Sequence, residues 1–167
     1  MASPVWSVGQ VLTASDVNTW FVGIVQAKPS DEGPITTTTL QNDNDLILVL
    51  AAGAQYRLEG YLAVTGNTIG TGDFKMTFSG PSGSSFRFTT FGYSLSAITT
   101  TAISAARSSG NASQGADGSS ASPVWIRGWV TTSATSGNLI LQWAENTGSA
   151  TGTSVLAGSW LEARRIG

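Results

Sequence analysis

Carboxylates and two lysines, Lys28 and Lys75, are the side chains of this sequence that suit proton transfer, because the chain contains no histidine and no cysteine. Histidine is the usual general acid or base near neutral pH, and cysteine is a strong nucleophile at that pH. A serine or threonine nucleophile would need one of the remaining groups as its base. No segment of the sequence resembles an activated serine, so covalent catalysis is not predicted.

Glycoside hydrolysis needs only two carboxylates, and the ten acidic residues formally permit it. The candidates on expected strands are Glu59, Asp73, Glu145 and Glu162. Their alternation with apolar residues predicts that they point outward as ordinary surface residues, with Asp73 beside Lys75 as a solvated pair. No spacing singles out a catalytic pair, so the sequence predicts a protein that is not an enzyme.

Residues 42–45, Asn-Asp-Asn-Asp, are the one run of oxygen ligands that would suit Ca²⁺. The glycine and the distal glutamate of an EF-hand loop are missing from this run. Asn and Asp also favour tight turns, and we expect a turn that leads into Leu46. The sequence therefore predicts no metal and no cofactor.

Charged residues make up only 11% of the chain, against roughly 25% in typical soluble domains. The surface must be mostly neutral, and we expect copies of the same chain or neighbouring proteins to cover part of it. The net charge is −2, and the basic residues are scattered apart from Arg164 and Arg165. This pattern argues against a nucleic-acid partner.

The start of the sequence lacks the features of a signal peptide, and no run of eighteen apolar residues occurs. We therefore expect neither secretion by a signal peptide nor a membrane partner. Without cysteine there is no disulfide framework, so stability must come from packing and association. Synthesis in a reducing cytoplasm fits this composition.

Residues 1–28 are predicted to form a docking arm with one short amphipathic helix. Thr13 and Asp16 have the spacing of a helix N-cap and a third-position acid. The apolar stripe comprises Val17, Trp20, Phe21 and Ile24, and Trp6 lies upstream in an extended stretch. The stripe either covers one end of the chain's own sheet or docks onto a partner, and the sequence leaves both alternatives open.

Residues 29–34 read as a polar linker with two prolines, and strand patterns follow it. The expected strands are residues 36–40, 46–50, 55–64, 73–79, a segment with Phe86 and Phe88, 124–132, 139–144 and a last one over 153–166. About eight short strands and one helix predict an all-β domain over residues 29–167. An antiparallel two-sheet jelly-roll sandwich is favoured, with an immunoglobulin-like sandwich as the competitor.

Residues 124–132 carry apolar side chains on both faces, with Trp125 and Trp129 on one and Val124, Ile126 and Val130 on the other. This strand is expected to be covered on both sides. Exposed aromatics such as Tyr61 and Tyr93 would suit a glycan, but core packing is the favoured role for most of them.

Residues 92–122 are rich in Ser, Ala, Thr and Gly and read as a flexible loop. Small polar residues bury little apolar area to offset the entropy of ordering a chain. We expect neighbouring chains to hold this loop in place.

Residues 6–21, Trp-Ser-Val-Gly-Gln-Val-Leu-Thr-Ala-Ser-Asp-Val-Asn-Thr-Trp-Phe, resemble the opening of small virion proteins of tailed phages that infect actinobacteria. Three further stretches are similar to the same family, at residues 39–46, at 56–62, and at 141–146 with 157–161. The resemblance spans most of the chain and implies a jelly roll like the trimeric heads of C1q and tumour necrosis factor. It also implies capsid decoration or a minor tail role, neither of them catalytic.

The resemblance and the neutral surface together predict a homotrimeric capsid decoration or cement protein, made in the bacterial cytoplasm and found in the virion. Its partners would be its own copies and the major capsid protein or other virion proteins. The expected docking residues are Trp6, Val17, Trp20, Phe21 and Ile24. The alternative is a minor tail or tail-tip protein that binds a host surface ligand, such as a glycan, through residues 92–122.

Overall fold

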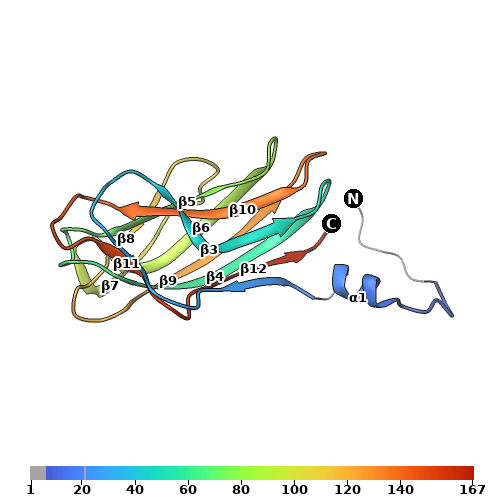
Figure 1. The fold of residues 1–167 in the computed structure, drawn as a ribbon, viewed down its shortest axis with the longest axis horizontal. Helices are drawn as coiled ribbons and strands as arrows, with labels where there is room; N and C mark the ends of the chain where they lie inside the picture. Colours follow the sequence, from blue (N-terminus) through green and yellow to red (C-terminus); the bar gives the residue numbers. More distant parts are fainter. Residues whose placement is uncertain (1–6, 21) are drawn as a thin grey trace.

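The computed structural model describes residues 7–20 and 22–167 and shows a nearly all-β chain with one short helix, as predicted (Figure 1). The elements in these residues are α1 (Ala14–Trp20), β1 (Ile24–Ala27), β2 (Glu32–Ile35), β3 (Gln41–Leu50), β4 (Gln55–Thr65), β5 (Phe74–Ser79), β6 (Ser85–Ser94), β7 (Ala97–Ile103), β8 (Ala112–Gln114), β9 (Ser122–Thr131), β10 (Gly137–Glu145), β11 (Thr153–Val155) and β12 (Trp160–Arg165).

Two antiparallel sheets pack face to face, which confirms the predicted jelly-roll-like sandwich. The large sheet has the strand order β1-β12-β4-β9-β6-β7. In this sheet β11 also pairs with β4, and β2 pairs with β11. The small sheet has the order β3-β10-β5-β8. From β3 to β6 the chain alternates between the sheets at every strand. Apart from the consecutive pair β6 and β7, neighbours in each sheet are therefore separated by at least one other strand in sequence, as in jelly rolls.

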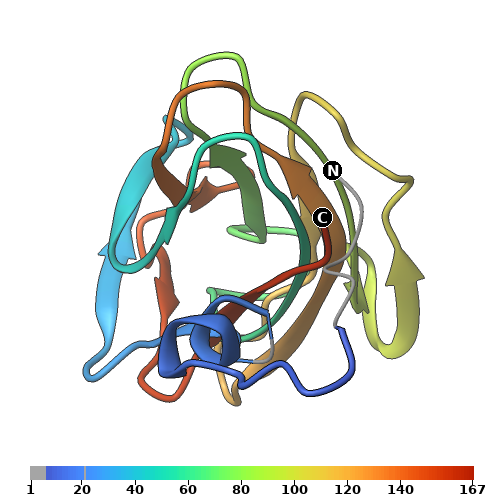
Figure 2. The same cartoon turned by 90° about the vertical axis from the view of Figure 1, so that its right-hand side faces the viewer.

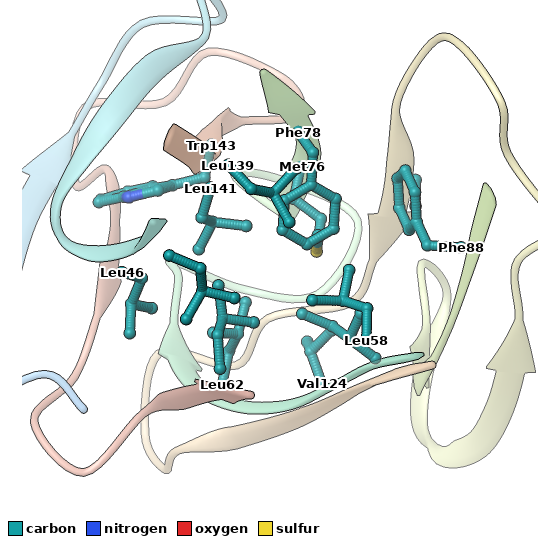
Figure 3. Packing of buried hydrophobic residues seen from close by; sticks show 14 of the residues in the cluster. Leu46, Leu58, Leu62, Met76, Phe78, Phe88, Val124, Leu139, Leu141 and Trp143 are labelled. Atoms are coloured by element: carbon teal, nitrogen blue, oxygen red, sulfur yellow. The ribbon is translucent and has the colours of Figure 1, made fainter. Parts of the chain in front are cut away.

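The core lies between the sheets and follows the alternation of the strands (Figure 3). On β4 the inward positions Tyr56, Leu58, Leu62 and Val64 are buried, and on β5 Phe74, Met76 and Phe78 are buried. Each large apolar side chain taken out of water contributes about 1.5–3 kcal/mol. The alternation of the sequence is thus the main reason that these segments become strands of a sandwich.

The first strands after the arm differ from the prediction. Residues 29–34 do not form a plain linker, because β2 (Glu32–Ile35) pairs with β11. Pro34 follows a cis peptide bond and has no N–H to donate, and β2 tolerates it because it pairs on one side only. Residues 36–40 lie outside the strands. The expected last strand is divided into β11 and β12, which pair with different parts of β4.

Residues 92–122 contain more regular structure than a flexible loop. They include the end of β6, all of β7, and β8, which pairs with β5 opposite Met76. The N–H of Gly115 donates to the carbonyl oxygen of Tyr93, 2.8 Å away. Sheet hydrogen bonds from the same chain therefore order much of this segment. Local composition missed them because β7 and β8 are built of small and polar residues and because β5, the partner of β8, is distant in sequence.

The chain itself covers only one face of β9, whereas cover on both faces was expected. Val124, Ile126 and Val130 face the core and are buried. Trp125 and Trp129 face outward from the large sheet and are 50% and 36% exposed. The large sheet therefore presents an aromatic surface that no described part of the same chain covers.

Candidate association surface

The predicted docking residues of the arm fall into three groups. Trp6 and Phe21 lie outside the described residues. Trp20 is the last residue of α1, and its side chain is not among those described. Val17 lies on α1 and is exposed. Ile24 was expected on the helical stripe, but it lies in β1 opposite Ala163 and packs against the core. The helix ends before Ile24 because the chain there joins the large sheet.

Two reciprocal hydrogen bonds define the start of α1. The N–H of Asp16 donates to Oγ1 of Thr13 over 3.2 Å, and the N–H of Thr13 donates to Oδ2 of Asp16 over 2.9 Å. This is the capping box that the sequence predicted, and it satisfies backbone donors that have no partner inside the helix. The hydrogen bonds lower the pKa of the Asp16 carboxyl.

The described arm exposes apolar side chains at one end of the sandwich. Figure 1 shows α1 beyond the ends of the strands, near the C terminus, and Figure 2 shows it below the opening of the sandwich. Val11 is 83% exposed and Val22 is 53% exposed, with Val8, Leu12 and Val17 also exposed. A hollow of about 210 Å³ separates the helix from the sandwich, lined by Asn18 and Val22 on the arm side. The described apolar side chains of the arm are thus packed only in part on the sheet of the same chain.

One apolar row crosses five strands on the outer face of the large sheet. Trp160 of β12 is paired with Tyr61 of β4, Tyr61 with Trp125 of β9, Trp125 with Phe91 of β6, and Phe91 with Ile103 of β7. Paired residues in adjacent strands point to the same face of a sheet. We call these five residues the aromatic row, and with strands about 4.8 Å apart it is about 19 Å long.

Two hollows lie along the aromatic row. One, of about 400 Å³, is lined by Trp160, Phe91 and Trp125 together with Glu59 and Arg127. The other, of about 290 Å³, lies between Trp125 and Ile103. The rings of Tyr61 and Trp125 have centroids 4.8 Å apart and planes tilted by 55°. The surface is therefore uneven, with protruding rings and adjoining hollows.

Charged side chains flank the aromatic row on one side. The next positions along the strands pair Glu162 with Glu59 and Glu59 with Arg127. Glu59 lies 3.3 Å from the guanidinium of Arg57 and 3.9 Å from that of Arg127. The next outward positions along the same strands surround Trp129. They hold the exposed basic residues Arg164, Arg57 and Arg87. Four of the six arginines of the chain, Arg57, Arg87, Arg127 and Arg164, thus share this face.

The four candidate glycosidase carboxylates do not form one group. Glu59 and Glu162 lie on the outer face of the large sheet, as expected for surface residues. Asp73 and Glu145 are buried, so the prediction of outward side chains is wrong for them. Asp73 accepts hydrogen bonds from the N–H groups of Gly70 and Ala116, and Glu145 accepts one from the N–H of Ser149. These two carboxylates satisfy the backbone of turning loops.

Residues 42–45 form no simple tight turn, because they belong to β3. The register steps from the pair Ile140–Ile47 to the pair Gln142–Asn42, so a bulge of β3 stands opposite Leu141. Oδ1 of Asp43 accepts the N–H groups of Asp45 and Leu46 over 3.0 and 2.9 Å. The aspartate satisfies backbone donors that the bulge leaves without ladder partners.

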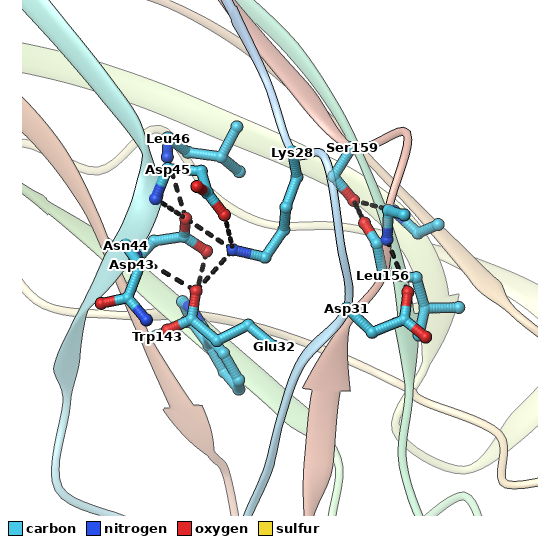
Figure 4. Close-up of polar contacts among 12 residues, drawn as sticks. Lys28, Asp31, Glu32, Asp43, Asn44, Asp45, Leu46, Trp143, Leu156 and Ser159 are labelled. Carbon is cyan, nitrogen blue, oxygen red and sulfur yellow. Dashed lines mark hydrogen bonds and ion pairs between the residues drawn. The ribbon is translucent and has the colours of Figure 1, made fainter.

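Glu32, Asp43 and Asp45 bring three carboxylates within 4.8 Å of one another, which is the spacing of a metal site (Figure 4). The ammonium of Lys28 lies among them, 2.9 Å from Asp43 and 3.0 Å from Asp45, and it also pairs with Glu32. We call these four residues the Lys28 cluster. Since a cation of the chain itself fills the position between the carboxylates, the arrangement is an internal ion-pair network.

No protein-family model, no curated protein and no solved structure matches this chain. Among the described residues, no helix has the length and apolar character required to span a membrane.

The alternation around Trp125 and Trp129 indicated an apolar outer face on β9. The alignment of Trp160, Tyr61, Phe91 and Ile103 with it depends on the register of five strands, which no local pattern encodes.

Proposed function

We propose that this protein is a non-enzymatic structural component of a phage virion. It acts as a homotrimeric capsid decoration or cement protein that its N-terminal arm helps to anchor. One observation carries the proposal. The arm holds five apolar side chains at one end of the sandwich that the described chain leaves fully or partly exposed, namely Val8, Val11, Leu12, Val17 and Val22. The resemblance of residues 6–21 to small virion proteins supplies the context.

Exposed apolar side chains on a short segment are unfavourable in water unless a partner buries them. The capping box fixes the start of the helix, so the arm presents a partly ordered apolar surface. A partner that buries this surface gains the hydrophobic free energy with less ordering cost than an unstructured segment would impose.

The mechanism is mass action. A protein that binds only the assembled shell stabilises that shell by a free energy that grows with the logarithm of its concentration relative to its dissociation constant. In a trimer three arms act together, and the effective concentration of the second and third arms multiplies one modest contact into firm binding.

The test uses shells that lack this protein and compares the full-length protein with a variant that lacks residues 1–22. The cut spares Ile24, because β1 belongs to the large sheet. We expect the truncated protein to keep its circular dichroism spectrum and to lose at least tenfold in shell affinity. Undiminished binding of a folded truncated protein would overturn the role of the arm.

The number of copies per virion separates the two virion locations. Quantitative mass spectrometry of purified particles should find hundreds of copies for a decoration protein. A handful of copies would contradict the decoration proposal and favour a tail or tail-tip location.

A further inference from the structure

We propose that the outer face of the large sheet is the surface through which copies of this chain associate, with the aromatic row at its centre. This inference rests on the proposed function, because it names the contact surface of the proposed trimer. Trp125 is the central residue of the row, flanked by Tyr61 and Phe91 on neighbouring strands.

The composition of this face is that of a protein interface. Aromatic residues and arginine are enriched in such interfaces, and tryptophan, tyrosine and arginine dominate their binding energy. The face combines four aromatic strand positions in direct succession with four of the six arginines, and these aromatic residues are Trp160, Tyr61, Trp125 and Phe91. Trp125 and Ile103 are 50% and 68% exposed, which is costly for such side chains in a free monomer.

The shape of the face suits interlocking side chains better than a flat ligand. The rings of Tyr61 and Trp125 are tilted by 55°, so they form no common plane on which a sugar ring would stack. The row ends in the aliphatic Ile103 beside a hollow of about 290 Å³. Protruding side chains next to hollows on the same surface allow knobs of one copy to enter hollows of another.

Charge favours a second copy as the occupant. The row beside the aromatic residues runs from acid to base, from Glu162 on β12 through Glu59 on β4 to Arg127 on β9. In a cyclic trimer two different parts of the surface meet at each contact. The acidic part of one copy can therefore face the basic part of the next. Within the described residues Glu162 forms no ion pair, and Arg127 has only a 3.9 Å contact.

Size-exclusion chromatography with light scattering and analytical ultracentrifugation of the full-length protein test this inference. Two strand positions give a matched pair of substitutions. Ile103, on the aromatic row, is 68% exposed, and Val49, on β3 of the small sheet, is 64% exposed. We expect the wild type to have three times the chain mass. Ile103→Asp and Trp125→Asp should raise the dissociation constant at least tenfold, whereas Val49→Asp should leave it unchanged.

A charge exchange tests the contact between copies. We expect Glu162→Arg and Arg127→Glu each to weaken the trimer, and the double variant to regain most of the affinity. Among the described ion pairs of the wild-type copy, none joins these two side chains, since β4 lies between β12 and β9 and places the two strands about 9.6 Å apart. Failure of the double variant to recover would overturn this pairing.

The outcomes separate this inference from the proposed function. If the wild type is a trimer and both Trp125→Asp and Ile103→Asp leave it intact, the inference is wrong while the virion proposal stands. If the wild type is a monomer at tens of micromolar that binds a polysaccharide through Trp125, the second copy is not the occupant. A monomer without affinity for virus particles would overturn both proposals.

Discussion

The ammonium of Lys28 lies 2.9 Å from Oδ1 of Asp43, and both side chains are completely buried. Lys28 directly follows β1 of the large sheet, and Asp43 lies in the bulge of β3 in the small sheet. The second oxygen of Asp43 accepts the indole N–H of Trp143 over 3.0 Å. This contact therefore joins the two sheets at the point where the arm enters the sandwich.

Replacing Lys28 by methionine should destabilise the fold strongly. The substitution keeps the length of the side chain but leaves the buried carboxylate of Asp43 without its cation, which typically costs about 3–5 kcal/mol. Urea unfolding followed by tryptophan fluorescence measures the free energy of unfolding. Lys75→Met is the control, because Lys75 is only partly buried and lies outside the Lys28 cluster. A loss below about 0.5 kcal/mol for Lys28→Met, within the range of ordinary surface substitutions, would contradict the prediction.

Stability should fall at alkaline pH because of the same lysine. Burial by itself lowers the pKa of Lys28, but hydrogen bonds to Glu32, Asp43 and Asp45 outweigh it and raise the pKa above 10.5. A raised lysine pKa gives stability that is complete below 10.5 and is lost as pH rises through the folded value. The difference in unfolding free energy between wild type and Lys28→Met should therefore shrink above pH 10.5. A constant difference up to pH 12 would refute this prediction.

Asp73 should give a pH dependence of the same sign in the acidic range. Burial raises the pKa of its carboxyl above 3.8, although hydrogen bonds from the N–H groups of Ala116 and Gly70 counteract part of this effect. The folded state then holds the proton more tightly than the unfolded state, so stability falls as pH rises from 3.8 through the folded pKa. In Asp73→Asn the amide oxygen can accept the same N–H groups without ionising. The stability of this variant relative to wild type should rise over that window, as urea titrations between pH 3.5 and 7 would measure. A flat difference would show that the ionised carboxylate carries no such cost.

Thr13→Ala should loosen α1 without affecting the sandwich. Loss of the N-cap hydroxyl costs about 1 kcal/mol of helix stability. Nuclear magnetic resonance Cα shifts of residues 14–20 should move toward coil values, while those of the strands stay unchanged. Thr135→Ala, at an exposed loop position, is the control. If the shell affinity depends on an ordered helix, Thr13→Ala should weaken it as well. Unchanged helix shifts would show that the capping box is dispensable.

Gly128→Ala should destabilise the sandwich from inside the large sheet. Gly128 lies between Leu58 of β4 and Phe88 of β6, and an added Cβ would approach Cα and Cβ of Phe88 to 2.9 Å. Overpacking of this kind costs about 1–3 kcal/mol. Gly148→Ala is the matched control, because its added Cβ would meet nothing closer than the carbonyl oxygen of Thr36 at 3.7 Å. Thermal unfolding that is equal for the two variants would contradict the prediction.

Local patterns predicted the main core strands, but they did not predict which strands pair with one another. The alternation of β4, β5, β9 and β10 was readable because a half-buried strand needs an apolar side chain at every second position. The segment of β7 and β8 has no such signal, since small residues fit exposed and buried positions equally well. The buried positions of Asp73 and Glu145 were missed because backbone donors of loops satisfy these carboxylates, from the distant Ala116 for Asp73 and from the nearby Ser149 for Glu145, and hydrophobic alternation does not record such hydrogen bonds.

The sequence by itself determined an all-β sandwich, a short helix capped at Thr13 and a surface poor in charge, because these properties depend on composition and on short-range periodicity. Only the tertiary structure decided that five strands in register align Trp160, Tyr61, Trp125, Phe91 and Ile103 in one row. It also decided that Lys28 is enclosed by carboxylates from β2 and β3. Both arrangements arise from pairings between residues far apart in the chain, whose register is set by the packing of the whole sandwich.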